Sequence, residues 1–308
     1  VLSCGECPIA CAKGYRRERV QMEGPEFETV GLFGPNMGIM DPDDIAYLNY
    51  LCNQYGLDTI TAGSLIGGLL GTELFPADSV DRKELVAELL GKITRREGIG
   101  SLLAEGPVAT AAELGLTDRM PQIKGLGFPA YDPRISYGTA LAYMTADRGA
   151  CHLRSWPVGR EMGGMWADDD INGRIAFVKG QQDDKAAEES LTVCQFVYGI
   201  GLLNDVLARL VNATTGEDWD LARMKLAGER CWTLSRVFNT REGISRKDDY
   251  LPRKFAEEPV LDGPIAGKVM SRATQDYLLD YYYDLREWSA DGIPQDSLID
   301  RLGLRDLL

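Results

Sequence analysis

Apolar side chains recur every three or four residues along much of the chain, as they do on one face of a helix. Residues 41–55 show this spacing after an Asp-Pro-Asp-Asp start, which supplies a cap and acidic side chains at the positive helix end. In residues 81–97 the same design recurs, with Asp81 placed to cap and Glu84 to complete a capping box. The periodicity predicts further helices over residues 186–212, 217–237 and 268–289.

Strand-like alternation is rare, and no strand–helix–strand succession is visible. No GxGxxG follows a predicted strand, so the pattern does not support a Rossmann nucleotide site. A stretch rich in Gly and Pro at residues 115–134 interrupts the helical pattern. We place a domain boundary there, giving residues 1–122 and 123–308, with residues 98–106 as the alternative position.

Charge and length exclude several classes of protein. The 308 residues carry a formal net charge of −14, which argues against nucleic acid as a partner because phosphate binding needs clustered Lys and Arg. The longest uncharged stretches, residues 62–72 and 195–204, are far shorter than the ~20 apolar residues that a bilayer requires. There is no signal-peptide pattern, so we expect a cytoplasmic protein without a membrane partner. The chain opens with Val, from which we expect a processed, truncated or fragmentary sequence.

The chain has one histidine, His152. A single imidazole excludes, for this chain alone, HExxH proteases and zinc enzymes with several histidine ligands. A Ser-His-Asp triad would have to use His152.

Cysteine spacing indicates a metal site. Three of the seven cysteines, Cys4, Cys7 and Cys11, lie within eight residues, with a Gly and a Pro shaping the turn. Thiolate-rich sites select zinc or iron–sulfur clusters. The alternatives are a redox C-x-x-C with disulfides, a structural zinc and a cubane cluster, of which the spacing favours the cluster. The candidates for a fourth ligand are Cys52, Cys151, Cys194 and Cys231.

Two further segments carry carboxylates or small residues suited to chemistry. Glu26 and Glu28 form either a solvated acidic turn or a carboxylate held near a redox centre to activate water. Asp58 and Thr59 follow a predicted helix end, where they cap the next helix or, with the small residues around them, let backbone N–H groups approach a ligand.

Two later segments are equally ambiguous. His152 lies between Arg148 and Arg154, so it is either a structural residue or part of an anion-recognising loop, and the arginines would lower its pKa. Cys194 lies on an apolar face of the helix predicted over residues 186–212, where it is either a core residue or a ligand.

Taken together, these segments resemble the tungsten-containing aldehyde ferredoxin oxidoreductase family. The resemblance extends from residue 4 to about residue 256 and corresponds to the C-terminal two-thirds of family members. The matching motifs, in chain order, are the cysteine cluster with CPI, GPEFET, YGLDTI, AYDPR, RGACHL, VFNTREG, the Asp248-Asp249 pair and Leu251-Pro252.

The resemblance implies an all-α, multihelical fold of two helical domains. It implies a [4Fe-4S] cluster on Cys4, Cys7, Cys11 and Cys194, and a tungsten or molybdenum ion held by two pterins without a protein ligand to the metal. By the same resemblance His152 and either Glu28 or Glu26 are catalytic, with Glu28 preferred. The implied cofactor-binding residues are Asp58, Thr59, Arg154, Glu189 and Val193.

The implied activity is oxidation of an aldehyde to a carboxylate, with water as co-substrate and ferredoxin as electron acceptor; a homodimer is allowed. Two departures matter. Glu189 and Thr192 stand where the family has Asp and Gly, and the β-rich domain that forms the base for the pterins would precede residue 1. The other readings are an aromatic acyl-CoA reductase of the same fold and an isolated, non-catalytic iron–sulfur module.

Overall fold

The computed structural model describes residues 2–17, 20–167, 169–196 and 204–308. The chain forms two compact units, each of which we describe by itself. Unit 1 comprises Val1–Asp132 with Pro252–Lys254, and unit 2 comprises Pro133–Leu251 with Phe255–Leu308. The domain boundary predicted at residues 122 and 123 stays a prediction.

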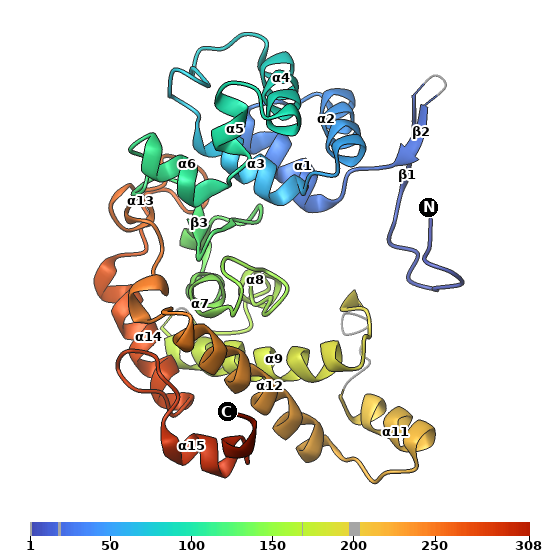
Figure 1. The fold of residues 1–308 in the computed structure, drawn as a ribbon, viewed down its shortest axis with the longest axis vertical. Helices are drawn as coiled ribbons and strands as arrows, with labels where there is room; N and C mark the ends of the chain where they lie inside the picture. The colour runs from blue at the N-terminus through green and yellow to red at the C-terminus, as the bar shows by residue number, and fades with distance from the viewer. Residues whose placement is uncertain (1, 18–19, 168, 197–203) are drawn as a thin grey trace. The chain divides into compact units, whose positions relative to one another are not determined.

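Unit 1 is a group of helices preceded by an antiparallel hairpin (Figure 1). Its elements are β1 (Gly14–Arg17), β2 (Val20–Glu23), α1 (Phe27–Phe33), the 3-10 turn η1 (Pro35–Met37), α2 (Pro42–Tyr55), α3 (Thr59–Gly68), α4 (Arg82–Arg95), α5 (Ile99–Leu103), α6 (Pro107–Glu113), β3 (Gln122–Ile123) and β4 (Leu126–Gly127).

The core of unit 1 lies between α1, α2, α3 and α4. Phe33, Leu48, Ile66 and Leu90 contribute fully buried side chains from these four helices. Burying a side chain of this kind stabilises the fold by about 1.5–3 kcal/mol. Cys52, also fully buried, belongs to the same core.

Unit 2 is built around two long helices, α9 and α12, which pack against each other (Figure 1). Its elements are η2 (Pro133–Ile135), α7 (Tyr137–Thr145), α8 (Val158–Met162), α9 (Ile171–Ser190), α11 (Asn204–Thr215), α12 (Leu221–Arg241), η3 (Arg246–Asp248), α14 (Arg272–Leu285), α15 (Asp296–Arg301) and η4 (Arg305–Leu307), with α13 (Arg253–Glu257) where the chain passes from unit 1 to unit 2.

Gly228 permits the close packing of α9 and α12. A Cβ at this position would lie 1.9 Å from the backbone oxygen of Asp183 on α9, so any larger residue would force the helices apart. Buried polar groups then join α14 to this pair. Arg286, 1 % exposed, forms an ion pair with Asp183, and Tyr282 donates its hydroxyl to Gln182 Oε1 at 2.6 Å. Buried polar groups that are paired in this way avoid the desolvation penalty of unpaired ones.

The all-α, multihelical prediction is confirmed, since the described residues otherwise form only two small two-stranded sheets. The helix predicted over residues 41–55 is confirmed, with Asp41 accepting from the N–H of Asp43 and Gly56 ending it in the left-handed region. Asp81 caps α4 as predicted, by accepting from the N–H of Glu84. The prediction that Glu84 completes the capping box is wrong, because the Glu84 side chain pairs with Lys83 instead.

One helix prediction is wrong in a way that affects the candidate site. Residues 186–212 are not one helix: α9 ends at Ser190, and Thr192 adopts φ 57°, a left-handed conformation that interrupts a helix. Cys194 therefore lies in an irregular stretch after α9, exposed, and not on an apolar helix face. Among the described residues, no helix is long and apolar enough to cross a bilayer.

Candidate functional site

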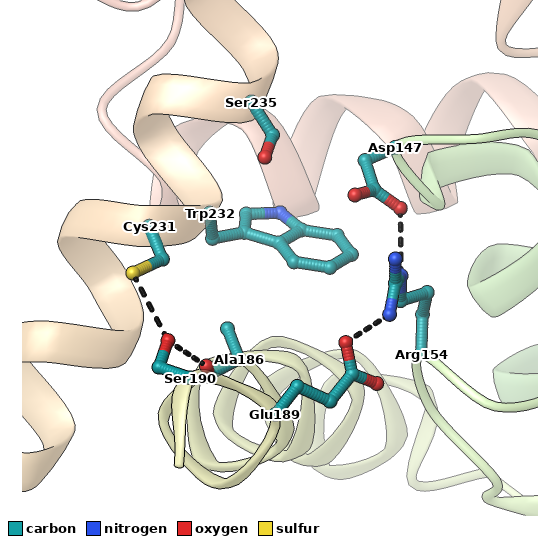
Figure 2. Close-up of a pocket in the computed structure, with 8 residues that line it drawn as sticks. All are labelled: Asp147, Arg154, Ala186, Glu189, Ser190, Cys231, Trp232 and Ser235. Atoms are coloured by element: carbon teal, nitrogen blue, oxygen red, sulfur yellow. Dashed lines mark hydrogen bonds and ion pairs between the residues drawn. The ribbon is translucent and has the colours of Figure 1, made fainter. Parts of the chain in front are cut away.

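Within unit 2 a pocket of about 270 Å³ opens between α9, α12 and the loop of residues 146–157. Figure 2 shows Trp232 of α12 extending across this pocket toward the polar group at its other side. The volume is slightly below the roughly 300–1,000 Å³ of pockets that enclose a drug-sized ligand, so one end of such a ligand would fill it. The lining residues are Asp147, Arg154, Ala186, Glu189, Ser190, Cys231, Trp232 and Ser235.

Arg154 is the centre of the polar side of the pocket. Its Nε donates to Oδ1 of Asp147 at 2.9 Å, and its Nη1 donates to Oε2 of Glu189 on α9 (Figure 2). These two carboxylates raise the pKa of Arg154 against the opposing effect of burial. The structure thus brings together two of the predicted cofactor-binding residues, Arg154 and Glu189.

The helices on either side hold the loop in place. On α12, Asn239 donates its amide to the backbone oxygen of Asp147 at 2.6 Å. On α9, Gln181 accepts from the hydroxyl of Ser155 and from the N–H of Trp156. Gly149, at φ 108°, provides a turn that a side chain would strain. Anchored at both ends, the loop presents Arg154 and its neighbours in a defined conformation.

His152 lies on the same loop, half-buried. Burial, followed by the positive charges of Arg148 and Lys185, lowers the pKa of its imidazole to about 4. The direction predicted from the neighbouring arginines is therefore correct, although burial is the larger cause. At neutral pH His152 is uncharged, so its ring offers one N–H donor and one nitrogen acceptor.

Two ionisable residues near the end of α9 were not predicted from the sequence. Lys185 is 5 % exposed and Glu188 is 2 % exposed. Burial lowers the pKa of Lys185, and burial raises the pKa of Glu188 to about 7. Their helical spacing places them on the inward face of α9 with Gln181. The sequence pattern could reveal this only if it were already known which face of the helix is buried.

In unit 1 the structure separates the two candidate glutamates. Glu26 occupies the N-cap position of α1, exposed, and makes no side-chain capping bond. Glu28 is buried, and its Oε2 accepts from the N–H of Ala130 at 2.5 Å. Burial raises the pKa of Glu28, while the hydrogen bond from Ala130 opposes the rise.

Asp58 and Thr59 lie where α3 begins. Asp58 caps this helix by accepting from the N–H groups of Ile60 and Thr61, which confirms the capping role that the sequence suggested. The Thr59 hydroxyl is 2.9 Å from the hydroxyl of Thr29, the residue after Glu28. Unit 1 therefore places Thr59 close in space to the segment that carries Glu28.

The cysteines divide by exposure. Cys4 and Cys11 are exposed and Cys7 is half-buried. The N–H of Cys7 donates to the backbone oxygen of Cys4 at 3.0 Å, which closes a turn. All three are free thiols in unit 1, whereas Cys194 is a free, exposed thiol in unit 2. Over the residues that the structure describes, no three His, Cys, Asp or Glu side chains converge as a metal site.

The remaining cysteines have other environments. Cys52 is a core residue of unit 1, and burial raises the pKa of its thiol to about 12, which makes it unsuited to bind metal as a thiolate. Cys151 is 2 % exposed and accepts hydrogen bonds from its own loop. Cys231 is exposed at the pocket, with its sulfur 3.6 Å from the Ser190 hydroxyl.

Several pocket residues had no signal in the sequence. Trp232 is one of many apolar residues on a predicted helix, and only the packing of α12 on α9 turns it toward the pocket. Its indole Nε1 donates to the Tyr282 hydroxyl at 3.0 Å, which fixes the ring. Val193 packs against the small core of Ala187 and Met224 and does not line the pocket.

Comparisons with known proteins agree with the fold and the motifs. The family model described as aldehyde ferredoxin oxidoreductase, domains 2 & 3, matches residues 2–304. The tungsten-containing aldehyde ferredoxin oxidoreductase of Pyrococcus furiosus is 34% identical over an alignment that covers 98% of this chain and 52% of that protein. The Thermococcus kodakarensis protein of the same name is 32% identical, over 99% of this chain and 53% of its own length.

A solved structure shares the fold at lower identity. It is the active-site complex BamBC of benzoyl coenzyme A reductase with 1,5-dienoyl-CoA, with a TM-score of 0.76, 22% identity, and coverage of 98% of this chain and 52% of that one. The chain thus spans about half the length of the curated relatives it matches. On the match over residues 2–304, the chain belongs to the aldehyde ferredoxin oxidoreductase family, of which it carries domains 2 and 3.

Proposed function

We propose that this chain is the part of a tungsten-containing oxidoreductase that oxidises an aldehyde to a carboxylate and passes the electrons to ferredoxin. The observation that carries the proposal is in unit 2, where Arg154 and Glu189, two residues predicted from the family motifs, meet at one polar pocket. The names of relatives at 32–34% identity support the reaction and the electron acceptor.

For the [4Fe-4S] cluster we propose Cys4, Cys7, Cys11 and Cys194 as ligands. The donor chemistry fits, because all four are free thiols of which three are exposed and one is half-buried. The alternative fourth ligands fit less well: Cys52 and Cys151 are buried. Cys231 remains accessible, so it serves as the comparison in the experiment below.

For a pterin we propose that unit 2 contributes Arg154, Glu189 and the backbone near Val193, and that unit 1 contributes Asp58 and Thr59. The pocket fits the polar edge of one pterin ring, since it offers a guanidinium, two carboxylates and an indole face. When bound, the tungsten–pterin group would supply two-electron chemistry, and the cluster would supply one-electron transfer toward ferredoxin. The choice of tungsten follows the names of the relatives, with molybdenum as the alternative.

The protein side chains would manage protons and polarise the substrate. His152, neutral at pH 7, would donate its N–H to the aldehyde oxygen, which stabilises negative charge developing there. Glu28 would accept a proton from water; its burial and raised pKa suit a general base better than the exposed Glu26. The overall reaction converts aldehyde and water to carboxylic acid, two protons and two electrons.

A second candidate is reduction of an aromatic acyl-CoA. The fold shared with the benzoyl coenzyme A reductase complex is the observation in its favour. Its identity to this chain is 22%, against 34% for the Pyrococcus furiosus aldehyde enzyme, so the aldehyde reaction is preferred. A non-catalytic iron–sulfur module remains the third alternative.

Metal analysis and a substrate panel on the full-length protein distinguish these functions. Tungsten together with about four irons per chain, and turnover of aldehydes with ferredoxin, is the expected result. Turnover of aromatic acyl-CoA in place of aldehydes would favour the second candidate, and iron without tungsten would favour the third. Cys194→Ser should lower the iron content, whereas the matched variant Cys231→Ser should leave it unchanged.

A further inference from the structure

The hairpin of β1 and β2 coincides with the most basic stretch of an acidic chain. The whole chain has a formal net charge of −14, yet four of the seven residues 13–19 are Lys or Arg and one is Glu. No other stretch of seven residues contains more than three Lys or Arg. A protein of strongly negative charge repels an acidic partner, so a local positive stretch provides a place where such a partner is attracted.

The hairpin follows the cysteine cluster directly (Figure 1). The N–H of Leu2 donates to the backbone oxygen of Ala12 at 2.7 Å, and this pairing closes the loop that carries the three cysteines. The backbone oxygen of Lys13, the next residue, accepts from the N–H of Gly24 at 2.6 Å. The basic stretch therefore begins two residues after the third cysteine, and backbone hydrogen bonds fix this connection.

One face of the hairpin is held against α2. Tyr15 donates its hydroxyl to Oδ1 of Asp43, and Asn49 donates its amide to the backbone oxygen of Glu23 at 3.3 Å. Side chains alternate between the two faces of a strand, so Arg16 lies on the face opposite to Tyr15. The hairpin thus has one face attached to unit 1 and one face that points away from α2.

The basic side chains described on this hairpin are accessible and keep their charge. Lys13 and Arg16 are both exposed. The Nη2 atom of Arg16 donates to Oε1 of Gln21, its cross-strand neighbour, at 3.0 Å. Because Gln21 is neutral, this hydrogen bond orients the guanidinium without neutralising it.

Several exposed arginines elsewhere are compensated by carboxylates. Arg96 pairs with Glu105, and in unit 2 Arg223 pairs with Glu217 at 2.9 Å. Such pairs present little net charge to an approaching protein. The contrast with Arg16, which has a neutral partner, favours the hairpin as the place where an acidic partner is attracted.

We propose that the exposed face of the hairpin, with Lys13 and Arg16, is the docking surface for an acidic electron-carrier protein. The inference rests on the proposed function, in which a cluster on the neighbouring cysteines passes electrons to ferredoxin. Electron carriers bind through small, transient interfaces, and complementary charge governs how quickly and in which orientation the partners meet. The hairpin is both charged and adjacent in the chain to the cysteines from which electrons would leave.

Charge reversal on the full-length, metal-loaded protein tests the proposal. In the double variant Lys13→Glu with Arg16→Glu, the KM for a purified acidic ferredoxin at low ionic strength should rise about tenfold, because electrostatic steering is lost. The dependence of this KM on salt should also weaken. The rate with benzyl viologen, a small cationic dye that needs no docking surface, should not fall.

A matched control changes the same amount of charge at other exposed positions. Arg119→Glu with Lys268→Glu removes one arginine and one lysine outside the hairpin, and it should leave the KM for ferredoxin nearly unchanged. Circular dichroism establishes that both double variants are folded. An unchanged KM in the folded hairpin variant would overturn the proposal, as would an equal rise in the control.

Cross-linking tests the surface without turnover. A carbodiimide joins a lysine amine to a carboxylate of a bound partner, so the complex with ferredoxin at low salt should give a cross-link at Lys13, identified by mass spectrometry. Lys13→Arg keeps the charge but lacks the amine, so it should lose this cross-link and still bind ferredoxin. Cross-links that never include Lys13, or no binding of ferredoxin by the folded protein, would overturn the proposal.

Failure of the proposed function gives a different result. A protein that oxidises no aldehyde with either acceptor would contradict that function, while binding and cross-linking would still test the hairpin. Conversely, full activity with ferredoxin in the hairpin variant would leave the function intact and remove only the docking surface.

Discussion

Arg154 and Glu189, thirty-five residues apart in the chain, form an ion pair at the edge of the unit 2 pocket. The pair connects a loop to the last turn of α9, just before the irregular stretch that carries Cys194. Asp147 holds the other side of the same guanidinium. A ligand that enters the pocket therefore meets a charge arrangement already formed by the protein.

Glu189→Gln should weaken this arrangement without removing the shape of the side chain. We expect the free energy of unfolding of the protein to fall by about 1–2 kcal/mol, since the pair is partly exposed and solvent screens it. Urea denaturation measures the change. Glu242→Gln, at an exposed position, is the control and should change stability by less than about 0.5 kcal/mol. Equal effects of the two variants would contradict a stabilising role for the pair.

The stability of the protein should depend on pH through Glu188. Its pKa is raised from 4.5 to about 7 in the folded protein, so its contribution is fully present below pH 4.5 and is lost as the pH rises through about 7. Glu188→Gln stays uncharged at every pH. Relative to the unaltered protein it should therefore be more stable at pH 8 than at pH 4.5, by up to about 3 kcal/mol.

Thermal unfolding at these two pH values checks the effect of Glu188→Gln. His152 acts in the opposite direction, since its lowered pKa removes stability as the pH falls from 6.5 toward 4, so the comparison must be with the unaltered protein at each pH. A difference in melting temperature that is the same at pH 4.5 and pH 8 would exclude a buried, ionising Glu188.

Thiol labelling should sort the cysteines by burial. In the metal-free folded protein, a thiol reagent at pH 8 should react rapidly with the four exposed cysteines. Cys52 should react only on unfolding, because it is buried and its pKa is raised to about 12. Mass spectrometry of the labelled peptides identifies each site. Rapid labelling of Cys52 would show that the core of unit 1 opens readily. The exposed cysteines are Cys4, Cys11, Cys194 and Cys231.

A buried ion pair between Arg236 of α12 and Asp249 should contribute more to stability than the surface pairs. Arg236, 4 % exposed, lies with its Nη2 2.8 Å from Oδ2 of the fully buried Asp249, and the Tyr283 hydroxyl donates to the same oxygen. Asp249→Asn leaves the arginine charge buried without its counter-ion, at a cost of about 3–5 kcal/mol. Calorimetry or urea denaturation measures it, with exposed Asp262→Asn as the control, for which we expect almost no change.

Helix starts could be predicted because their causes are local. The cap that Asp41 makes depends on an amide two residues away, and the cap that Asp81 makes on one three residues away. The end of α9 could not be predicted in this way. Residues 186–212 keep an apolar pattern throughout, and the break at Thr192 follows from a left-handed backbone that no local composition demanded.

By itself, the sequence determined the helical character of the chain, the close spacing of Cys4, Cys7 and Cys11, and the motifs that place it in its family. Only the tertiary structure decided that Glu28 is buried and Glu26 exposed, that Arg154 meets Glu189, and that Trp232 faces a pocket. The physical reason is distance along the chain. Capping and periodicity act within a few residues, whereas burial and charge pairing depend on segments that only packing brings together.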